Sequence, residues 1–186
     1  MKRLFLILFL CFGFLKADIG FELNKNVSIK YYNFIKTYNG YKRINNLISR
    51  LISDKNFVNY ADMFENRAKV STLDILKRIS GVFNSDKLKK EILQKRSLSF
   101  LDLSVKQIEK IEKYENNSLF NQKIKHINKI LENMKKTHNV KGIRTIKREL
   151  YAILQKFTYD LETLKVNIKT VNKLKRLNSL IRKNLN

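Results

Sequence analysis

The chain of 186 residues contains no proline, no tryptophan, a single cysteine and only five glycines. Without proline, nothing in the sequence forces a helix to kink or break, and few positions favour the backbone conformations that glycine permits. The lone cysteine, Cys11, excludes an intramolecular disulfide and any metal site built from several thiolates. These absences favour long helices that are held together by packing alone.

Cys11 lies in an apolar run with the pattern of a secretory signal peptide. Lys2 and Arg3 precede the apolar residues 4–15, and the small residue Ala17 stands where the chain becomes polar again. As a helix this run is about 18 Å long, whereas the hydrocarbon core of a bilayer is about 30 Å thick. We therefore expect residues 1–17 to be an export signal that is cleaved near Ala17.

Two alternatives concern the same segment. The first is a leader that is not cleaved and stays as a membrane anchor, because Leu15 is a bulky residue close to the cleavage position. Lipid modification of Cys11 is the second alternative, although the apolar run continues on both sides of this residue. Cleavage near Ala17 would leave a mature protein without cysteine.

Basic residues outnumber acidic ones by 39 to 16, and the excess is unevenly placed. Residues 18–115 contain 19 basic and 12 acidic side chains, whereas residues 116–186 contain 17 basic and 4 acidic ones. The codon usage of an AT-rich genome would raise the lysine content throughout the chain, but it does not explain this difference. The C-terminal part therefore predicts a basic surface.

The candidate partner-binding residues are cations of this basic part. Those from 165 onward are spaced as one stripe along a helix, and a row of cations concentrates positive potential. Such a surface suits an anionic membrane, an anionic glycan or a nucleic acid, and the plainer interpretation is a solvated helix face. The candidates are Lys135, Lys136, Lys141, Arg144, Lys147, Arg148, Lys165, Lys169, Lys173 and Arg176.

Apolar residues recur every three or four positions along nearly the whole chain, which predicts an all-α protein. A first helix from about residue 28 either ends at Gly40 or continues through it. Asp54 is placed to cap the next helix, and the spacing of Ser71 and Asp74 resembles a capping box. The helix that follows this box is predicted to end at Gly81.

The final third has a regular heptad seam, in which apolar residues alternate steps of three and four. It predicts a long antiparallel, coiled-coil-like helical hairpin over residues 117–186, after an N-terminal helical bundle over residues 18–116. If residues 143–184 form one helix it is about 63 Å long, so we expect either that the molecule is elongated or that this helix bends. The seam can close within one chain or between two copies. The seam residues are Phe120, Ile124, Ile127, Leu131, Met134, Ile143, Ile146, Leu150, Ile153, Phe157, Leu161, Leu164, Ile168 and Val171.

Little in the sequence indicates catalysis or a cofactor. His126 and His138 have no ligand partner at metal-binding spacing, and no HExxH, glycine-rich phosphate loop or GxSxG motif is present. We expect a protein without enzymatic activity, cofactor or metal. Residues 29–43 mix tyrosines with cations. We expect most of these aromatic rings to pack in the helix core, and Tyr31 and Tyr32 to be exposed.

Taken together, these patterns predict an exported bacterial protein of the periplasm or cell surface. Its expected role is that of a helical interaction or structural module, whose partner is another envelope or host protein and whose basic face meets anionic membrane or glycan. A first alternative is an adhesin-like binder of host polyanions such as sulfated glycans. A second is a nucleic-acid-binding protein, which requires that the N-terminus is not a signal.

Overall fold

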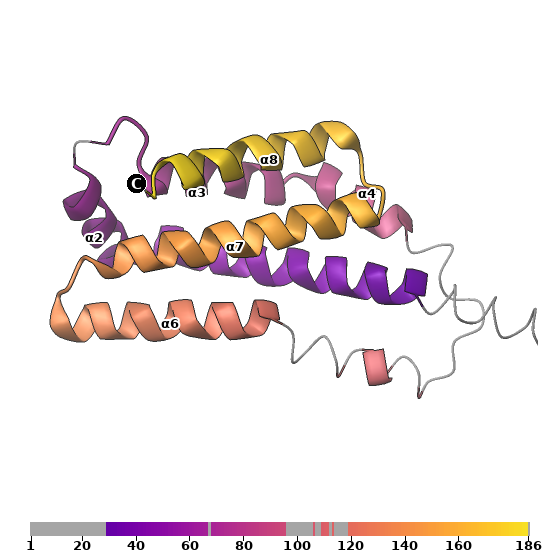
Figure 1. The fold of residues 1–186 in the computed structure, drawn as a ribbon, viewed down its shortest axis with the longest axis horizontal. Coiled ribbons are helices and arrows are strands. Elements are labelled where there is room, and N and C mark those ends of the chain that lie inside the picture. The colour runs from indigo at the N-terminus through magenta and orange to yellow at the C-terminus, as the bar shows by residue number, and fades with distance from the viewer. Residues whose placement is uncertain are drawn as a thin grey trace, which may run out of the picture.

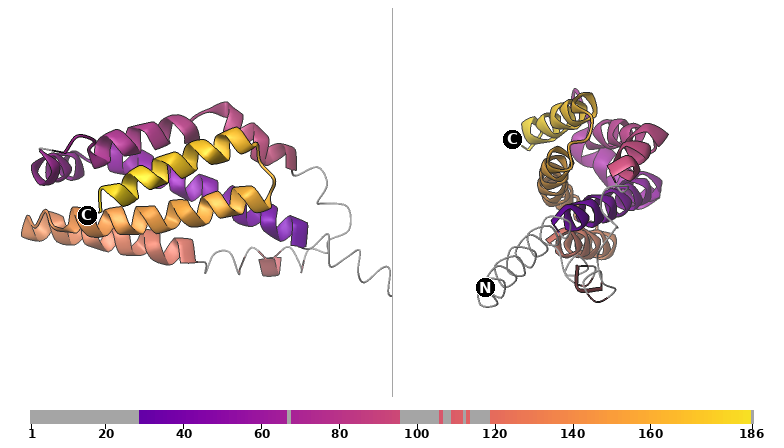
Figure 2. Two further views of the ribbon diagram at one scale, coloured as in Figure 1. Left: turned by 45° about the horizontal axis from the view of Figure 1, so that its top comes forward. Right: turned by 90° about the vertical axis from the view of Figure 1, so that its right-hand side faces the viewer.

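The computed structural model describes residues 29–66, 68–95, 106, 109–111, 113 and 119–185. Every regular element within these ranges is helical, which confirms the predicted all-α class. The helices pack together as a bundle that is longer along the helix axes than across them (Figures 1 and 2). The predicted signal peptide, with Cys11, lies outside the described residues.

The most central helix of the bundle is α7, which packs against α6 and against α8 (Figure 1). The N-terminal described helix, drawn in indigo, also reaches α7, because Gly40 lies against Phe157. α3 packs against α8, so the C-terminal helix contacts a helix from the N-terminal half of the chain. The helices are 29–53, α2 (Lys55–Glu65), α3 (Thr72–Phe83), α4 (Asp86–Gln94), α6 (Leu119–Thr137), α7 (Gly142–Thr163) and α8 (Ile168–Lys183).

The helix caps predicted at Asp54 and at Ser71 with Asp74 are present, whereas Ser85, in the capping segment predicted at residues 84–86, makes no side-chain cap hydrogen bond to α4. The Asp54 carboxylate accepts hydrogen bonds from the backbone N–H groups of Asn56 and Phe57 at the start of α2. Ser71 and Asp74 form a complete capping box at the start of α3, with each side chain accepting from the other residue's backbone N–H. Because these bonds join residues at most three positions apart, the local sequence suffices to predict them.

Two glycines lie inside helices, and neither ends one. The helix 29–53 runs through Gly40, where a Cβ atom would lie only 3.3 Å from the Phe157 ring, so the glycine permits close packing. The prediction that α3 ends at Gly81 is wrong, since α3 continues to Phe83. Apart from its chain neighbours and the backbone of α3 itself, no described atom lies within 4 Å of a Cβ built on Gly81, and α3 continues past this residue.

Residues 143–184 do not form the single helix that was considered from the sequence. α7 ends at Thr163, and Lys165 adopts a left-handed backbone with φ 55°. The N–H of Lys165 bonds to the carbonyl of Glu162, and the N–H of Val166 bonds to that of Leu161, which is the Schellman arrangement. α8 therefore folds back along α7, and Ile168, expected in the seam, is 70 % exposed.

The seam before this turn is largely buried. α6 and α7 run antiparallel and side by side, joined by residues 138–141 (Figures 1 and 2). Ile124 is the one seam residue between Phe120 and Leu161 that is half-buried, and the others are buried. The supercoiled geometry of a coiled coil stays a prediction.

Buried apolar side chains from both predicted parts of the chain form a single hydrophobic cluster. Its aromatic centre joins three helices, because the ring of Phe83 lies 5.7 Å from that of Tyr41 and 5.3 Å from that of Phe157. The Tyr41 hydroxyl donates to the Phe83 carbonyl at 2.8 Å. The boundary at residues 116 and 117 stays a prediction, and core packing crosses it. Tyr31, predicted to be exposed, is buried at 3 % exposure, and Tyr32 is half-buried.

Candidate functional site

The predicted basic residues divide into three groups in the structure. Lys147 is buried and forms an ion pair with Glu65, so it is not part of any surface. Lys135 is engaged by Asp54 at 3.1 Å and by Glu132 at 3.4 Å. The remaining candidates are exposed: Lys136, Lys141, Arg144, Arg148, Lys165, Lys169, Lys173 and Arg176.

Two of the exposed candidates line the same depression as a third lysine, which was not among the residues predicted from the sequence. Lys169 and Lys173 of α8 line a depression of about 250 Å³ together with Lys87 of α4. We call these three lysines the basic patch. Lys165 does not belong to it, since the turn before α8 breaks the predicted stripe. The depression is further lined by Gly81, Val82, Ser85 and Thr170.

The acidic side chains of the C-terminal part are all engaged elsewhere. Glu149 pairs with Lys123 at 2.7 Å and with His126 at 3.2 Å, and Asp160 pairs with Lys36 at 2.9 Å. The other two acids are Glu132, which pairs with Lys135, and Glu162, which pairs with Lys175. None of these four acids has an ion pair with the basic patch.

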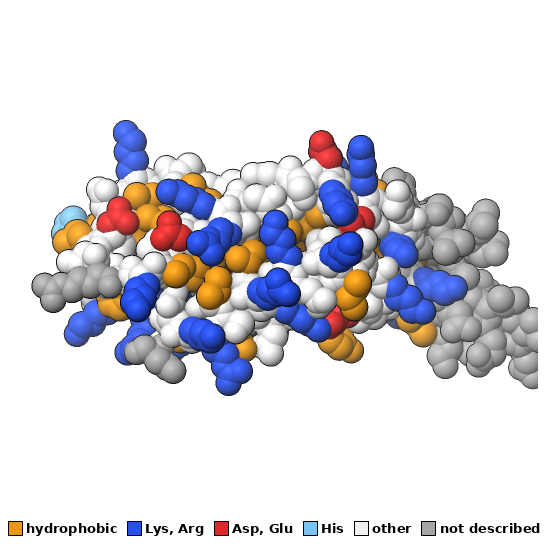
Figure 3. Space-filling model, turned by 90° about the horizontal axis from the view of Figure 1, so that it is seen from above, with side chains coloured by type: hydrophobic (Ala, Val, Ile, Leu, Met, Phe, Trp, Pro, Cys, Tyr) orange, Lys and Arg blue, Asp and Glu red, His pale blue; other side chains and the backbone are white. Residues whose placement is uncertain are grey.

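The basic patch is consequently left with uncompensated charge. Within the described ranges, Lys87, Lys169 and Lys173 have no carboxylate at ion-pair distance. Glu91 approaches the depression but accepts the hydroxyl hydrogen bond of Thr170 at 3.2 Å. Seen from the α8 side, Lys and Arg side chains spread over the surface and outnumber Asp and Glu (Figure 3).

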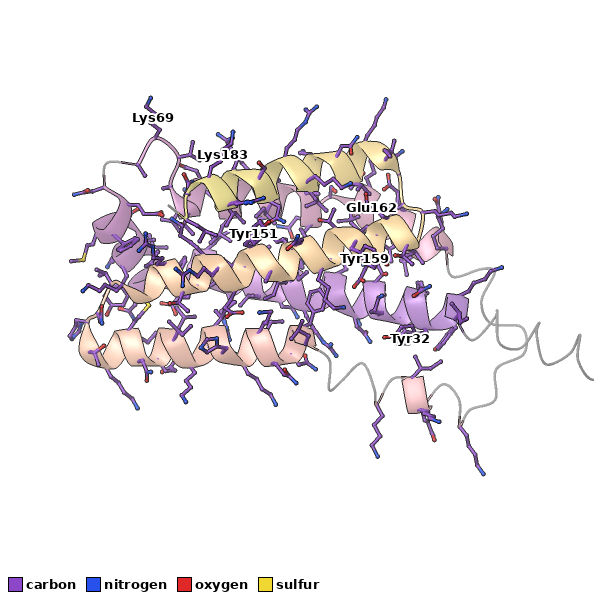
Figure 4. The ribbon with its side chains drawn as sticks, in the orientation of Figure 1. Tyr32, Lys69, Tyr151, Tyr159, Glu162 and Lys183 are labelled. Carbon is purple, nitrogen blue, oxygen red and sulfur yellow. The ribbon has the colours of Figure 1, made fainter. Side chains whose placement is uncertain are left out.

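A second concave surface, which we call the α7–α8 groove, was not predicted from the sequence. It has a volume of about 380 Å³ and lies between the two helices that the unexpected turn brings together. Tyr151, Tyr159 and Glu162 follow one another along α7 (Figure 4). The lining residues are Tyr151, Gln155, Thr158, Tyr159 and Glu162 of α7 and Lys175, Asn178, Ser179 and Arg182 of α8.

The electrostatic effects of the paired acids are local. Burial alone would raise the pKa of Glu149, but the Lys123 ammonium and the His126 ring that contact it lower the pKa below its ordinary value. For Asp54, burial is likewise outweighed by Lys135 and by the backbone N–H groups of α2, so its pKa is also lowered. These carboxylates are therefore held ionised as parts of the scaffold.

Neither histidine belongs to a metal site in the described chain. His126 contacts Glu149, and Nδ1 of His138 lies 3.3 Å from the Tyr60 hydroxyl. Nowhere in the described residues do three or more His, Cys, Asp or Glu side chains gather as metal ligands would. Among those same residues, no helix combines the length and apolar character needed to cross a membrane.

The scaffold thus presents two separate surfaces, one whose charged lining residues are all lysines and one of mixed aromatic, amide and charged character. They lie on different sides of α8, whose buried face includes Val171, Leu174 and Ile181. Comparison of the chain with protein-family models, with curated proteins and with solved structures finds no match in any of the three.

Proposed function

We propose that the protein is a non-enzymatic helical interaction module of the bacterial envelope, which uses its basic patch to dock onto an anionic membrane surface. The supporting observation is the convergence of Lys87, Lys169 and Lys173 on one depression without a paired carboxylate. Each lysine close to an anionic bilayer contributes about 1 kcal/mol. Three together therefore contribute roughly 3 kcal/mol, which corresponds to about a 100-fold change in affinity.

The location in the envelope is part of the same proposal. It rests on the signal-like residues 1–17 and on the cleavage expected near Ala17. Intact-mass measurement of the native protein after cell fractionation tests it, with a mass that begins at Asp18 in the envelope fraction as the supporting result. An uncleaved protein in the cytosolic fraction would favour the nucleic-acid alternative.

The docking itself is tested by sedimentation with vesicles that contain anionic lipid. The variant Lys87→Glu/Lys169→Glu/Lys173→Glu should lose most binding, and wild-type binding should fall steeply with added salt. The matched control is Lys55→Glu/Lys125→Glu/Lys129→Glu, which changes net charge equally at exposed positions of α2 and α6 that are not candidate binding residues. Equal losses in both variants would show that net charge alone acts and would overturn the role of the patch.

The polyanion alternative is separated in the same experiment. Retention on immobilised heparin that is lost in the Lys87→Glu/Lys169→Glu/Lys173→Glu variant, without binding of the wild type to anionic vesicles, would replace the membrane with an anionic glycan as the partner. The basic patch would then have the right charge but a different ligand.

A further inference from the structure

The α7–α8 groove differs in chemistry from the basic patch and is independent of it. Its volume of about 380 Å³ falls in the lower part of the range of small-molecule pockets, roughly 300–1,000 Å³. Two tyrosines, Tyr151 and Tyr159, are the aromatic residues of its lining, and Tyr159 is 64 % exposed. An exposed aromatic ring beside several polar side chains offers a flat stacking surface within hydrogen-bonding reach.

Asn178 is the group in this groove that most clearly lacks a partner. The residue is only 8 % exposed, and its Oδ1 atom is buried without a hydrogen bond. A buried polar atom left unpaired costs about 1–3 kcal/mol. Because an amide offers an acceptor and two donors, a ligand with hydroxyl groups can satisfy it in either orientation. The cost of leaving it unpaired is therefore recovered when such a ligand binds.

The charged side chains of the groove lie at different points along its length. Glu162 and Lys175 form an ion pair that joins α7 to α8 at one end. Arg182 lies two helical turns further along α8 and has no ion pair within the described chain. The planar guanidinium of arginine binds carboxylate and sulfate groups through two parallel hydrogen bonds. The groove therefore has one free cationic end and one neutralised end.

From this arrangement we propose that the α7–α8 groove binds a short acidic saccharide. The apolar face of a sugar ring stacks on Tyr159, and its hydroxyl groups exchange hydrogen bonds with Gln155, Asn178 and Ser179. Its carboxylate or sulfate group contacts Arg182. A neutral apolar ligand is a poorer match, because it would leave the amides and the guanidinium of the groove unpaired.

The binding is tested with the full chain and a panel of three probes: a glucuronate-containing disaccharide, its sulfated form and a neutral glucose disaccharide. Since the protein has no tryptophan, its intrinsic fluorescence comes from its eight tyrosines, and a ligand stacked on Tyr159 should change it. We expect the acidic disaccharides to bind at least about tenfold more tightly than the neutral one. Failure of all three probes to bind at millimolar concentration would overturn the proposal.

Variants locate the binding in the groove. Tyr159→Ala and Asn178→Leu should each weaken binding about tenfold or more. Asn178→Leu should still fold, because leucine is one of the residues most often found buried. Arg182→Gln should abolish the preference for the acidic disaccharide, and Arg176→Gln, at an exposed position of the same helix, should not. Unchanged affinity in Tyr159→Ala and Asn178→Leu would place the ligand elsewhere and refute the groove.

The two proposals fail separately. The variant with the three basic-patch lysines reversed should bind the saccharide as the wild type does, since the lining of the groove includes none of them. Conversely, Asn178→Leu should leave vesicle binding unchanged. Loss of saccharide binding in the basic-patch variant would show that only nonspecific charge attraction is at work and would refute the groove as the site.

Discussion

The ammonium group of Lys147 lies 2.6 Å from the carboxylate of Glu65, and each side chain is only 5 % exposed. The same carboxylate accepts the backbone N–H of Thr72 at 2.5 Å and its hydroxyl at 2.9 Å. One buried acid thus joins the end of α2, the start of α3 and the N-terminal part of α7. The protein itself supplies every polar partner in this cluster. We therefore interpret Lys147 and Glu65 as an ion pair with a structural role.

Removing one partner of this pair should be costly. Lys147→Met keeps most of the side-chain volume but leaves the Glu65 carboxylate buried without its counter-ion. We expect the free energy of unfolding to fall by about 3–5 kcal/mol, measured by urea denaturation. The double variant Glu65→Leu/Lys147→Met should be more stable than Lys147→Met alone, because it leaves no unpaired charge. A double variant that loses at least as much as the single one would contradict the buried-pair interpretation.

The same Gly→Ala substitution should have opposite effects at two positions. A Cβ on Gly142 would lie 2.6 Å from Cγ of Met134, which is buried in the α6–α7 contact, so Gly142→Ala should cost about 1–3 kcal/mol. Nothing lies within 4 Å of a Cβ on Gly81, and Gly81→Ala should stabilise α3 by about 0.5–1 kcal/mol. Thermal denaturation of the two variants provides the comparison. A stabilised Gly142→Ala protein would mean that α6 and α7 pack less closely than described.

The left-handed residue between α7 and α8 gives a third prediction. A left-handed backbone costs a residue with a side chain roughly 1–2 kcal/mol, whereas the greater freedom of glycine in the unfolded chain costs about 0.5–1 kcal/mol. Lys165→Gly should therefore stabilise the protein by up to about 1.5 kcal/mol in chemical denaturation. Lys165→Ala is the control, because alanine retains the strained backbone. If alanine stabilises as much as glycine, relief of charge repulsion is the cause.

This turn also shows why the sequence predicted the helices better than their ends. The Ser71 and Asp74 capping box depends on residues three positions apart, so the local pattern identified it. The end of α7 carries a lysine where glycine is usual, and apolar residues continue on both sides of it. The one available signal was Asn167, whose side chain caps α8 by accepting from the Lys169 N–H at 2.9 Å.

The site was predicted less well, because its surfaces depend on contacts between distant segments. Lys87 precedes Lys169 by 82 positions in the sequence, and only the packing of α8 near α3 and α4 brings the two together. The α7–α8 groove exists only because the chain turns before α8. For Lys147 the apolar periodicity did indicate a buried position, since this residue lies one turn from Ile143 and from Leu150 on the buried face of α7.

The pH dependence of stability should reveal the contact between α6 and α7. The pKa of Glu149 is lowered on folding, because its attraction to Lys123 and His126 outweighs the effect of burial. A carboxylate with a lowered pKa contributes stability at pH values above its unfolded pKa, about 4.3, and loses this contribution as the pH falls through the folded value. Glu149→Gln should therefore be less stable than the wild type at neutral pH, and the difference should vanish in acid.

Urea midpoints measured from neutral pH down to pH values below about 4 test this expectation. The control is Glu132→Gln, since the Glu132 side chain is 64 % exposed and pairs with Lys135 only at the surface. Substitutions at such positions change stability by less than about 0.5 kcal/mol, so the control curve should follow that of the wild type. A difference between Glu149→Gln and wild type that persists undiminished in acid would mean that the loss comes from packing of the Glu149 side chain. The charge of Glu149 would then not be what joins α6 to α7.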